Sequence, residues 1–230
     1  MSPRTRSLSG IAGIDEAGRG PMFGPMIVCG VLFDSSSIKK LRSLGVRDSK
    51  TLSVKKRETL AKMVHEMSSR VAIERIDALQ IDKLREQGVT LNDIEATAFS
   101  TVLRELSPAE VYADAADVNP KRFGERIGLE SGLILRNCKI VSEHKADSKY
   151  PVVSAASIIA KTTRDEIIRE LHGEYGDFGS GYPSDPRSVL FLRNLIRKNE
   201  KMPDFVRKTW KSVTQAISDS QKIQTKLEDY

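Results

Sequence analysis

Four acidic residues stand at or just beyond the ends of predicted strands: Asp15, Glu16, Asp114 and Asp147. Carboxylate oxygens are hard ligands that hold divalent cations, and two cations about 3.5–4 Å apart stabilise both the attacking and the departing oxygen of a phosphodiester. Without cations such a group repels itself, which opposes simultaneous ionisation. Carboxylates at strand ends also commonly act as caps or form salt bridges. Position alone therefore leaves both interpretations open.

The predicted strands would bring these carboxylates to one edge of a sheet. Strands are predicted at residues 11–15, 26–33, 71–77, 111–114 and 138–142. The first three are expected to form an antiparallel meander, and the last two to join through helical crossovers. Because adjacent strand residues point to opposite faces, Asp15 and Glu16 could share a cation only if the strand ends there. The glycines that follow, Gly18 and Gly20, favour this ending.

Helical patterns alternate with the later strands and then continue alone. After a short helix that follows a Ser-rich loop, helices are predicted at residues 53–68, 90–106, 151–171, 187–199 and 204–218. Pro151 suits the first turn of the third, and Pro203 separates the last two. The pattern predicts an α/β fold with a five-stranded mixed sheet flanked by helices. Residues 1–185 are expected to form this domain, and residues 186–230 a C-terminal helical extension.

Positive charge is concentrated in the predicted extension. Residues 186–230 carry ten Lys and Arg against five Asp and Glu, whereas the preceding residues carry 27 against 26. Such a segment attracts a phosphate backbone, although many basic tails are simply solvated. A stripe predicted to pack in the core consists of Val206, Trp210, Val213 and Ile217. The basic residues outside that stripe, Arg207, Lys208 and Lys211, are predicted to face a duplex backbone.

Other kinds of site are disfavoured by spacing. The dinucleotide fingerprint would need its third glycine at Phe23, and no Walker A or EF-hand pattern occurs. The three histidines are scattered, which disfavours zinc. Cys29 and Cys138 are interpreted as buried reduced thiols. The N-terminus lacks the apolar core of a signal peptide and no apolar run approaches the ~20 residues of a membrane helix, so a cytoplasmic location is expected.

Six blocks carry a family resemblance. They are residues 13–21 (GIDEAGRGP), 48–50 (DSK), 112–117 (YADAAD), 144–147 (HKAD), 154–161 (SAASIIAK) and 179–186 (GSGYPSDP). In this order they resemble type 2 ribonuclease H, the ribonuclease HII family, in its archaeal form. The sister type 3 enzymes lack Gly-Arg-Gly after the Asp-Glu pair, which favours type 2. The resemblance implies a ribonuclease-H-like fold.

The resemblance also implies roles for individual residues. The implied catalytic metal ligands, for two Mg²⁺ or Mn²⁺ ions, are Asp15, Glu16, Asp114 and Asp147. It leaves Asp117 structural. Recognition of a ribose 2′-hydroxyl falls on Gly18, Arg19, Gly20 and Tyr182, a chemistry that lets a site distinguish RNA from DNA. The implied substrate-binding set also includes Lys50, Ser157 and Lys161, among which the lysines are interpreted as phosphate ligands.

The implied reaction is cleavage of RNA–DNA hybrids, and of duplex DNA on the 5′ side of an embedded ribonucleotide, leaving a 3′-hydroxyl and a 5′-phosphate. One alternative is another nuclease or strand-transfer enzyme of the same fold, which would have no reason for the Gly-Arg-Gly segment and Tyr182. The other is a non-catalytic hybrid-binding module, which would be expected to have lost an acidic ligand.

The last residues carry a separate signal. Gln224, Leu227 and Tyr230 have the Gln-x-x-aliphatic-x-x-aromatic spacing with which replication proteins dock on sliding clamps. The usual second aromatic residue does not occur. We expect a weak clamp-binding tail here, and a frayed helix end is the alternative.

Overall fold

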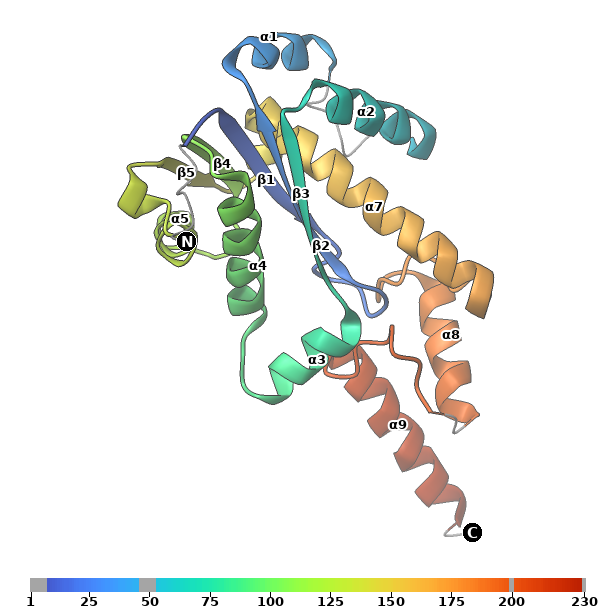
Figure 1. The fold of residues 1–230 in the computed structure, drawn as a ribbon. Coiled ribbons are helices and arrows are strands. Elements are labelled where there is room, and N and C mark those ends of the chain that lie inside the picture. Colours follow the sequence, from blue (N-terminus) through green and yellow to red (C-terminus); the bar gives the residue numbers. More distant parts are fainter. Residues whose placement is uncertain (1–7, 46–52, 199–200, 229–230) are drawn as a thin grey trace, which may run out of the picture. The chain divides into compact units, whose positions relative to one another are not determined.

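The computed structural model describes residues 8–45, 53–198 and 201–228, with side chains described only up to residue 222 (Figure 1). Its sheet has the strand order β3-β2-β1-β4-β5. The strands are β1 (Ile11–Ala17), β2 (Met26–Phe33), β3 (Arg70–Ile76), β4 (Glu110–Asp114) and β5 (Lys139–Glu143). β1 is antiparallel to β2 and parallel to β4, which is parallel to β5. The predicted five-stranded mixed sheet is confirmed.

β1 is longer than the sequence predicts. The strand was expected to end at Asp15, but its pairing with β2 continues through Asp15↔Cys29 and Glu16↔Val28 to Ala17↔Ile27. The prediction is wrong because β2 is buried along its whole length and supplies a partner for each of these residues. Asp15 and Glu16 therefore alternate within a regular strand, and they point to opposite faces of the sheet.

The helices are α1 (Ser35–Ser43), α2 (Val54–Met67), α3 (Ala78–Glu86), α4 (Leu91–Leu106), α5 (Pro120–Ser131), η2 (Ile134–Arg136), α6 (Ala146–Lys149), α7 (Pro151–Tyr175), α8 (Pro186–Arg197) and α9 (Lys211–Glu228). The strongly periodic helices α2, α4, α7 and α8 are confirmed within a few residues. Side-chain caps fix several starts: Ser53 accepts from Lys56 N, and Asp185 accepts from Arg187 N. Three helices, α3, α5 and the short α6, were not predicted from the sequence.

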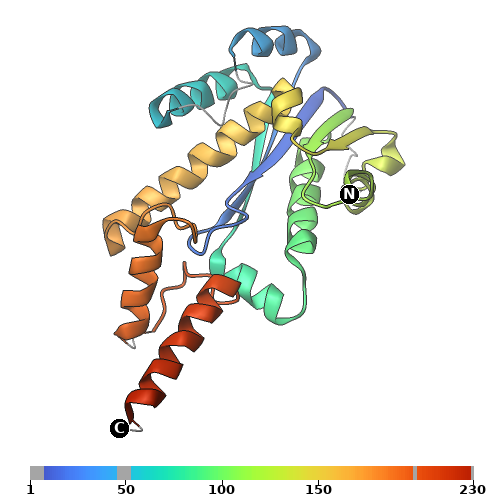
Figure 2. The same ribbon diagram turned by 180° about the vertical axis from the view of Figure 1, so that it is seen from behind.

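Helices cover both faces of the sheet. A Cβ on Gly13 would lie 2.0 Å from the carbonyl oxygen of Val152 in α7, whereas one on Gly30 would meet Val102 of α4 at 2.5 Å. Gly13 pairs with Val31 and Ile14 with Gly30, so the two glycines belong to opposite faces. Figures 1 and 2 accordingly show β1 and β2 between α4 and the first part of α7. Both close approaches require glycine.

The chain divides into two compact units. The first comprises Met1–Ala17, Ile27–Arg75 and Leu91–Thr163, and the second comprises Gly18–Met26, Ile76–Thr90 and Arg164–Tyr230. The proposed extension, residues 186–230, thus shares the second unit with earlier segments, and the boundary proposed at residue 185 does not coincide with a boundary between the units. Within the described residues, no helix combines the length and apolarity that crossing a membrane requires.

The second unit has an aromatic core around Phe23. Its ring makes edge-to-face contacts with Phe178 and Phe205 at centroid distances of 5.4 and 5.8 Å. Val206 and Val213 are buried in the same cluster, with Trp210 and Ile217 packed against it, so the predicted apolar stripe does face the core. The helix predicted from residue 204 is wrong, because α9 begins at Lys211. Residues 204–210 instead run beside the Phe23 segment, through an isolated bridge between Phe23 and Val206.

Candidate active site

The parallel pairing of β1 and β4 sets Asp15 beside Asp114. The last registered pair is Ile14↔Ala113, so the next residue on each strand is the carboxylate. Neighbouring strands lie about 4.8 Å apart, and paired residues share a face. Asp15 lies two residues beyond Gly13, so both carboxylates belong to the face that α7 covers.

Asp147 reaches the same edge from β5. The left-handed Lys145, with φ 56°, turns the chain after β5 into α6. The N–H of Ala146 then donates to Asp114 Oδ1 at 3.1 Å. Asp147 is the next residue and is only 4% exposed. The structure therefore sets Asp15 beside Asp114 on paired parallel strands, and it places Asp147 in α6 directly after the residue that binds Asp114.

The carboxylate of Asp15 lies in an unfavourable environment for a negative charge. The side chain is 4% exposed, and Oδ1 accepts from the N–H of Glu16 at 2.8 Å. Burial raises its pKa well above the usual range, and the charges of Glu16 and Asp114 raise it further. The Ser157 hydroxyl and the Lys161 ammonium lower this pKa to a smaller extent. The site thus attracts positive charge that the protein itself supplies only in part.

Ser157 and Lys161 face this site from α7. Lys161 Nζ donates to Ser157 Oγ at 2.7 Å. Ser157 is fully buried, so its hydroxyl serves Asp15 and Lys161 in this structure, whereas Lys161 is half-buried. Ser154 and Arg164 follow the same helical spacing as Ser157 and Lys161, and both are buried.

Glu16 is separated from the other carboxylates by strand alternation. It is half-buried and adjacent to Asp15, but the regular strand directs it toward the opposite face. In the part of the chain that the structure describes, no group of three or more His, Cys, Asp and Glu side chains is arranged to hold a metal ion. The donor chemistry still suits divalent cations, because buried carboxylates that repel one another are the ligands that hard cations compensate.

Asp117 has a different environment from Asp114. Its carboxylate forms an ion pair with Arg122 at 2.6 Å and accepts from Asn119 N at 2.9 Å, at the start of α5. These contacts agree with a structural role.

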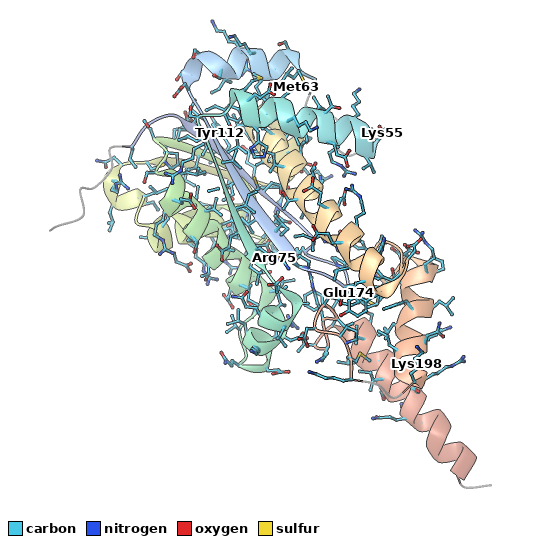
Figure 3. All side chains as sticks on the ribbon, turned by 45° about the vertical axis from the view of Figure 1, so that its right-hand side comes forward. Lys55, Met63, Arg75, Tyr112, Glu174 and Lys198 are labelled. Carbon is cyan, nitrogen blue, oxygen red and sulfur yellow. The ribbon has the colours of Figure 1, made fainter. Side chains whose placement is uncertain are left out.

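On β4, the ring of Tyr112 (labelled in Figure 3) lies 4.4 Å from that of Tyr150, just before α7. This contact helps to seat the beginning of α7 on the sheet.

The second unit brings together the residues predicted to recognise a 2′-hydroxyl. Gly18 has φ 88°, a conformation that favours glycine, and a Cβ there would lie 2.5 Å from Arg164 Nε. A Cβ on Gly20 would lie 3.5 Å from the ring of Tyr182, whose side chain is 39% exposed. The loop and the tyrosine are therefore neighbours. Lys50, predicted to bind phosphate, lies outside the described residues.

Arg207 corrects a prediction from the sequence. It was expected on an exposed helical face, but it is fully buried and belongs to no helix. Its guanidinium donates to the carbonyls of Gly18, Arg19 and Gly24. Burial, and then the charge of Arg164, lower the pKa of Arg207 to about 9. Periodicity could not reveal this contact, since the signal lies in the tertiary pairing of residues 204–210.

Comparisons with known proteins agree on one family. The family described as Ribonuclease HII matches residues 12–213. The Ribonuclease HII of Pyrococcus furiosus is 46% identical over 205 residues, which cover 88% of this chain and 89% of that protein. The crystal structure of the ribonuclease H2 from Pyrococcus horikoshii has a TM-score of 0.85 at 39% identity, covering 92% and 99% of the two chains. A PCNA:RNase HII complex from Archaeoglobus fulgidus has a TM-score of 0.81 at 40% identity, covering 88% and 95%.

Proposed function

The chain belongs to the ribonuclease HII family, and from this premise we propose that it cuts duplex DNA on the 5′ side of an embedded ribonucleotide with the help of two divalent cations. Family membership makes it an endoribonuclease that hydrolyses the RNA strand of RNA–DNA hybrids. The finer proposal rests on one observation: the parallel pairing of β1 with β4 sets Asp15 beside Asp114, and Asp147 follows Ala146, whose N–H donates to Asp114.

The acidic residues would hold the cations, as Mg²⁺ or Mn²⁺. Asp15, Asp114 and Asp147 would supply carboxylates at one sheet edge, whereas Glu16, on the opposite face of β1, would join them only if the end of this strand rearranges. When bound, two such ions activate a water and stabilise the departing 3′-oxygen. The charges of Glu16 and Asp114, which help to raise the pKa of Asp15, oppose its ionisation, and a bound cation would relieve this repulsion.

The remaining predicted residues would bind and orient the nucleic acid. Gly18, Arg19 and Gly20 allow close approach of the backbone to a ribose, and the neighbouring Tyr182 offers a ring and a hydroxyl. Lys161 carries an ammonium beside Asp15, where it would hold a phosphate oxygen without reading sequence. Lys50 is proposed for the same task from the sequence alone.

The test is cleavage of a DNA duplex that contains one ribonucleotide, with Mg²⁺ or with EDTA. We expect cleavage 5′ of the ribonucleotide only with Mg²⁺, and a loss on the order of 10³-fold in Asp15→Asn, since the metals supply several kcal/mol of transition-state stabilisation. Asp117→Asn is the matched control and should keep its activity, because that carboxylate is engaged by Arg122. Tight binding of the duplex without any cleavage would favour the non-catalytic alternative.

A second proposal concerns the C-terminus. The backbone of α9 extends to Glu228, whereas the side chains of Gln224 and Leu227, and the whole of Tyr230, lie outside what the structure describes. The similarity to a ribonuclease HII solved with PCNA supports docking of these residues on a sliding clamp. Deleting residues 224–230 should abolish capture by immobilised clamp and spare hydrolysis. Equal capture of the full-length and truncated chains would refute this proposal.

A further inference from the structure

The guanidinium of Arg207 is fully buried and is engaged by main-chain carbonyls. It donates from Nη2 to Gly18 O at 2.5 Å, from Nη1 to Arg19 O at 3.0 Å, and from Nε to Gly24 O at 3.0 Å. Arginine suits this task because its five donors form a rigid planar fork. Three carbonyls of one loop therefore have their positions set by a single side chain.

Trp210 completes the same contact. Its indole Nε1 donates to Gly20 O at 3.1 Å, and its ring centroid lies 4.7 Å from the Arg207 guanidinium. Together the two side chains hold the carbonyl oxygens of Gly18, Arg19 and Gly20, and none of these bonds uses an N–H of the loop. The carbonyl oxygens of these three residues are therefore engaged by side chains of the protein itself.

The segment that carries Arg207 is itself held in place. Asp82 accepts from Lys208 N at 2.7 Å, and from both Thr209 N and Thr209 Oγ1 at 3.0 and 2.6 Å. The N–H of Arg207 donates to Met22 O at 2.8 Å. These bonds fix the backbone on either side of the guanidinium, so the fork meets the loop from a defined position.

A second buried guanidinium supports the same surface. Arg164 is 6% exposed and donates to Phe23 O at 3.0 Å and to Pro25 O at 3.3 Å. Its Cζ lies 5.7 Å from the ring of Tyr182, and a Cβ on Gly20 would lie 3.5 Å from that ring. The loop and the tyrosine therefore rest on adjacent buried arginines.

We propose that Arg207 is a positioning residue for ribonucleotide recognition: by donating to the Gly18, Arg19 and Gly24 carbonyls, it fixes the loop that meets the 2′-hydroxyl. This inference rests on the proposed function and assigns part of its selectivity to a residue near the start of α9. A buried cation is unfavourable unless it is well hydrogen-bonded. If this position served packing alone, an apolar side chain would suffice. Holding three carbonyl oxygens in place requires a side chain with directional hydrogen-bond donors.

The test compares Arg207→Met, Arg207→Lys and Trp210→Phe with Val213→Ala, which weakens the neighbouring apolar cluster but removes no hydrogen-bond donor to the loop carbonyls. Steady-state cleavage is measured on duplex DNA with one ribonucleotide and on a long RNA–DNA hybrid. For Arg207→Met we expect kcat on the single ribonucleotide to fall up to about 100-fold with little change in KM, as for a misplacement near 1 Å. The long hybrid should lose less, because it offers further 2′-hydroxyls.

The more conservative variants, Arg207→Lys and Trp210→Phe, should change the selectivity between the two substrates less than Arg207→Met does. Arg207→Lys keeps the charge but not the fork, so its selectivity should lie between those of wild type and Arg207→Met. Trp210→Phe removes one hydrogen bond and should shift selectivity in the same direction by less. Val213→Ala should lower the unfolding temperature and leave the ratio of the two substrates unchanged.

Amide hydrogen exchange gives a readout independent of activity. The N–H groups of Met22 and Gly24 donate to Gly181 and Phe205, so they report on the loop, with residues 26–33 of β2 as the internal reference. Arg207→Met should speed exchange of the loop amides relative to β2, and Val213→Ala should not change this ratio.

The outcomes separate the two proposals. If the wild type cuts neither substrate, the proposed function fails, yet exchange still decides whether Arg207 holds the loop. If Arg207→Met does not fold, Trp210→Phe decides. Unchanged selectivity together with unchanged relative exchange in the folded variants would overturn the positioning role.

Discussion

Like charges lie side by side in the interior both at the acidic edge of the sheet and among the buried arginines of the second unit. The two regions differ in how this unfavourable burial of charge is compensated. Asp15 lies among carboxylates, and burial and its neighbours raise its pKa. Arg207 lies beside Arg164, and burial and that neighbour lower its pKa. In both cases the protein favours the neutral form relative to water.

The difference lies in what compensates the charge. Five carbonyl oxygens accept from the two guanidiniums, so the arginines are satisfied by the chain itself. Asp15 accepts from the N–H of Glu16 and is opposed only in part by Ser157 and Lys161. The buried arginines are satisfied within the fold, whereas at the proposed cation site a repulsion remains that a bound cation would relieve. Neutralising one charge in each region should therefore have opposite effects on stability.

Arg207→Met should give the larger change in stability. It leaves the carbonyls of Gly18, Arg19 and Gly24 without their donor, at about 1–3 kcal/mol for each buried group, offset in part by removal of a buried charge. We expect a net loss of about 3 kcal/mol in the free energy of unfolding, measured by urea denaturation. Lys211→Ala, at an exposed position, should change it little. A stabilised Arg207→Met would remove the contrast.

Asp15→Asn should act in the opposite direction when divalent cations are removed with EDTA. The pKa of Asp15 is raised in the folded state, so its favourable contribution is complete below the unfolded pKa and is lost as pH rises through the raised value. At neutral pH the variant should be more stable by on the order of 1 kcal/mol. Wild-type stability should decline with pH more steeply than that of the variant. Parallel pH profiles would contradict this.

The sequence predicts elements well where one face is buried against a regular partner. The strand 26–33 matches β2, and α2, α4 and α7 follow their apolar periodicity. The acidic edge was also predictable, because parallel strands collect their carboxyl ends. Two features were not. The end of β1 depends on pairing with β2, and the 204–210 segment depends on the Phe23 loop and on Asp82.

The same reasoning explains the outcome at single residues. Periodicity assigned Val206 and Val213 to the core correctly, since their burial follows from being apolar. It assigned Arg207 to the surface because arginine is seldom buried. Only contacts with residues more than 180 positions away reveal the carbonyls that compensate its charge. Buried charge is therefore the feature that sequence patterns describe least well.

The smallest predicted effect concerns Lys208, just before α9, and Lys211, its first residue, which remain at least partly accessible to solvent. Lys208 is half-buried and Lys211 exposed, and Figure 3 shows Lys198 extending from the end of α8. Replacing Lys208 and Lys211 by Ala should flatten the dependence of duplex binding on salt by up to about 0.9 log unit per log of salt for each lost phosphate contact. Fluorescence anisotropy in EDTA, between low and moderate salt, measures this slope without cleavage.

Arg207→Met should leave the slope unchanged, because the guanidinium that it removes is buried and contacts carbonyls, not solvent. If Arg207→Met flattens the slope as much as the double lysine variant, then Arg207 contacts phosphate in the complex, and the distinction between buried and solvated cations does not hold.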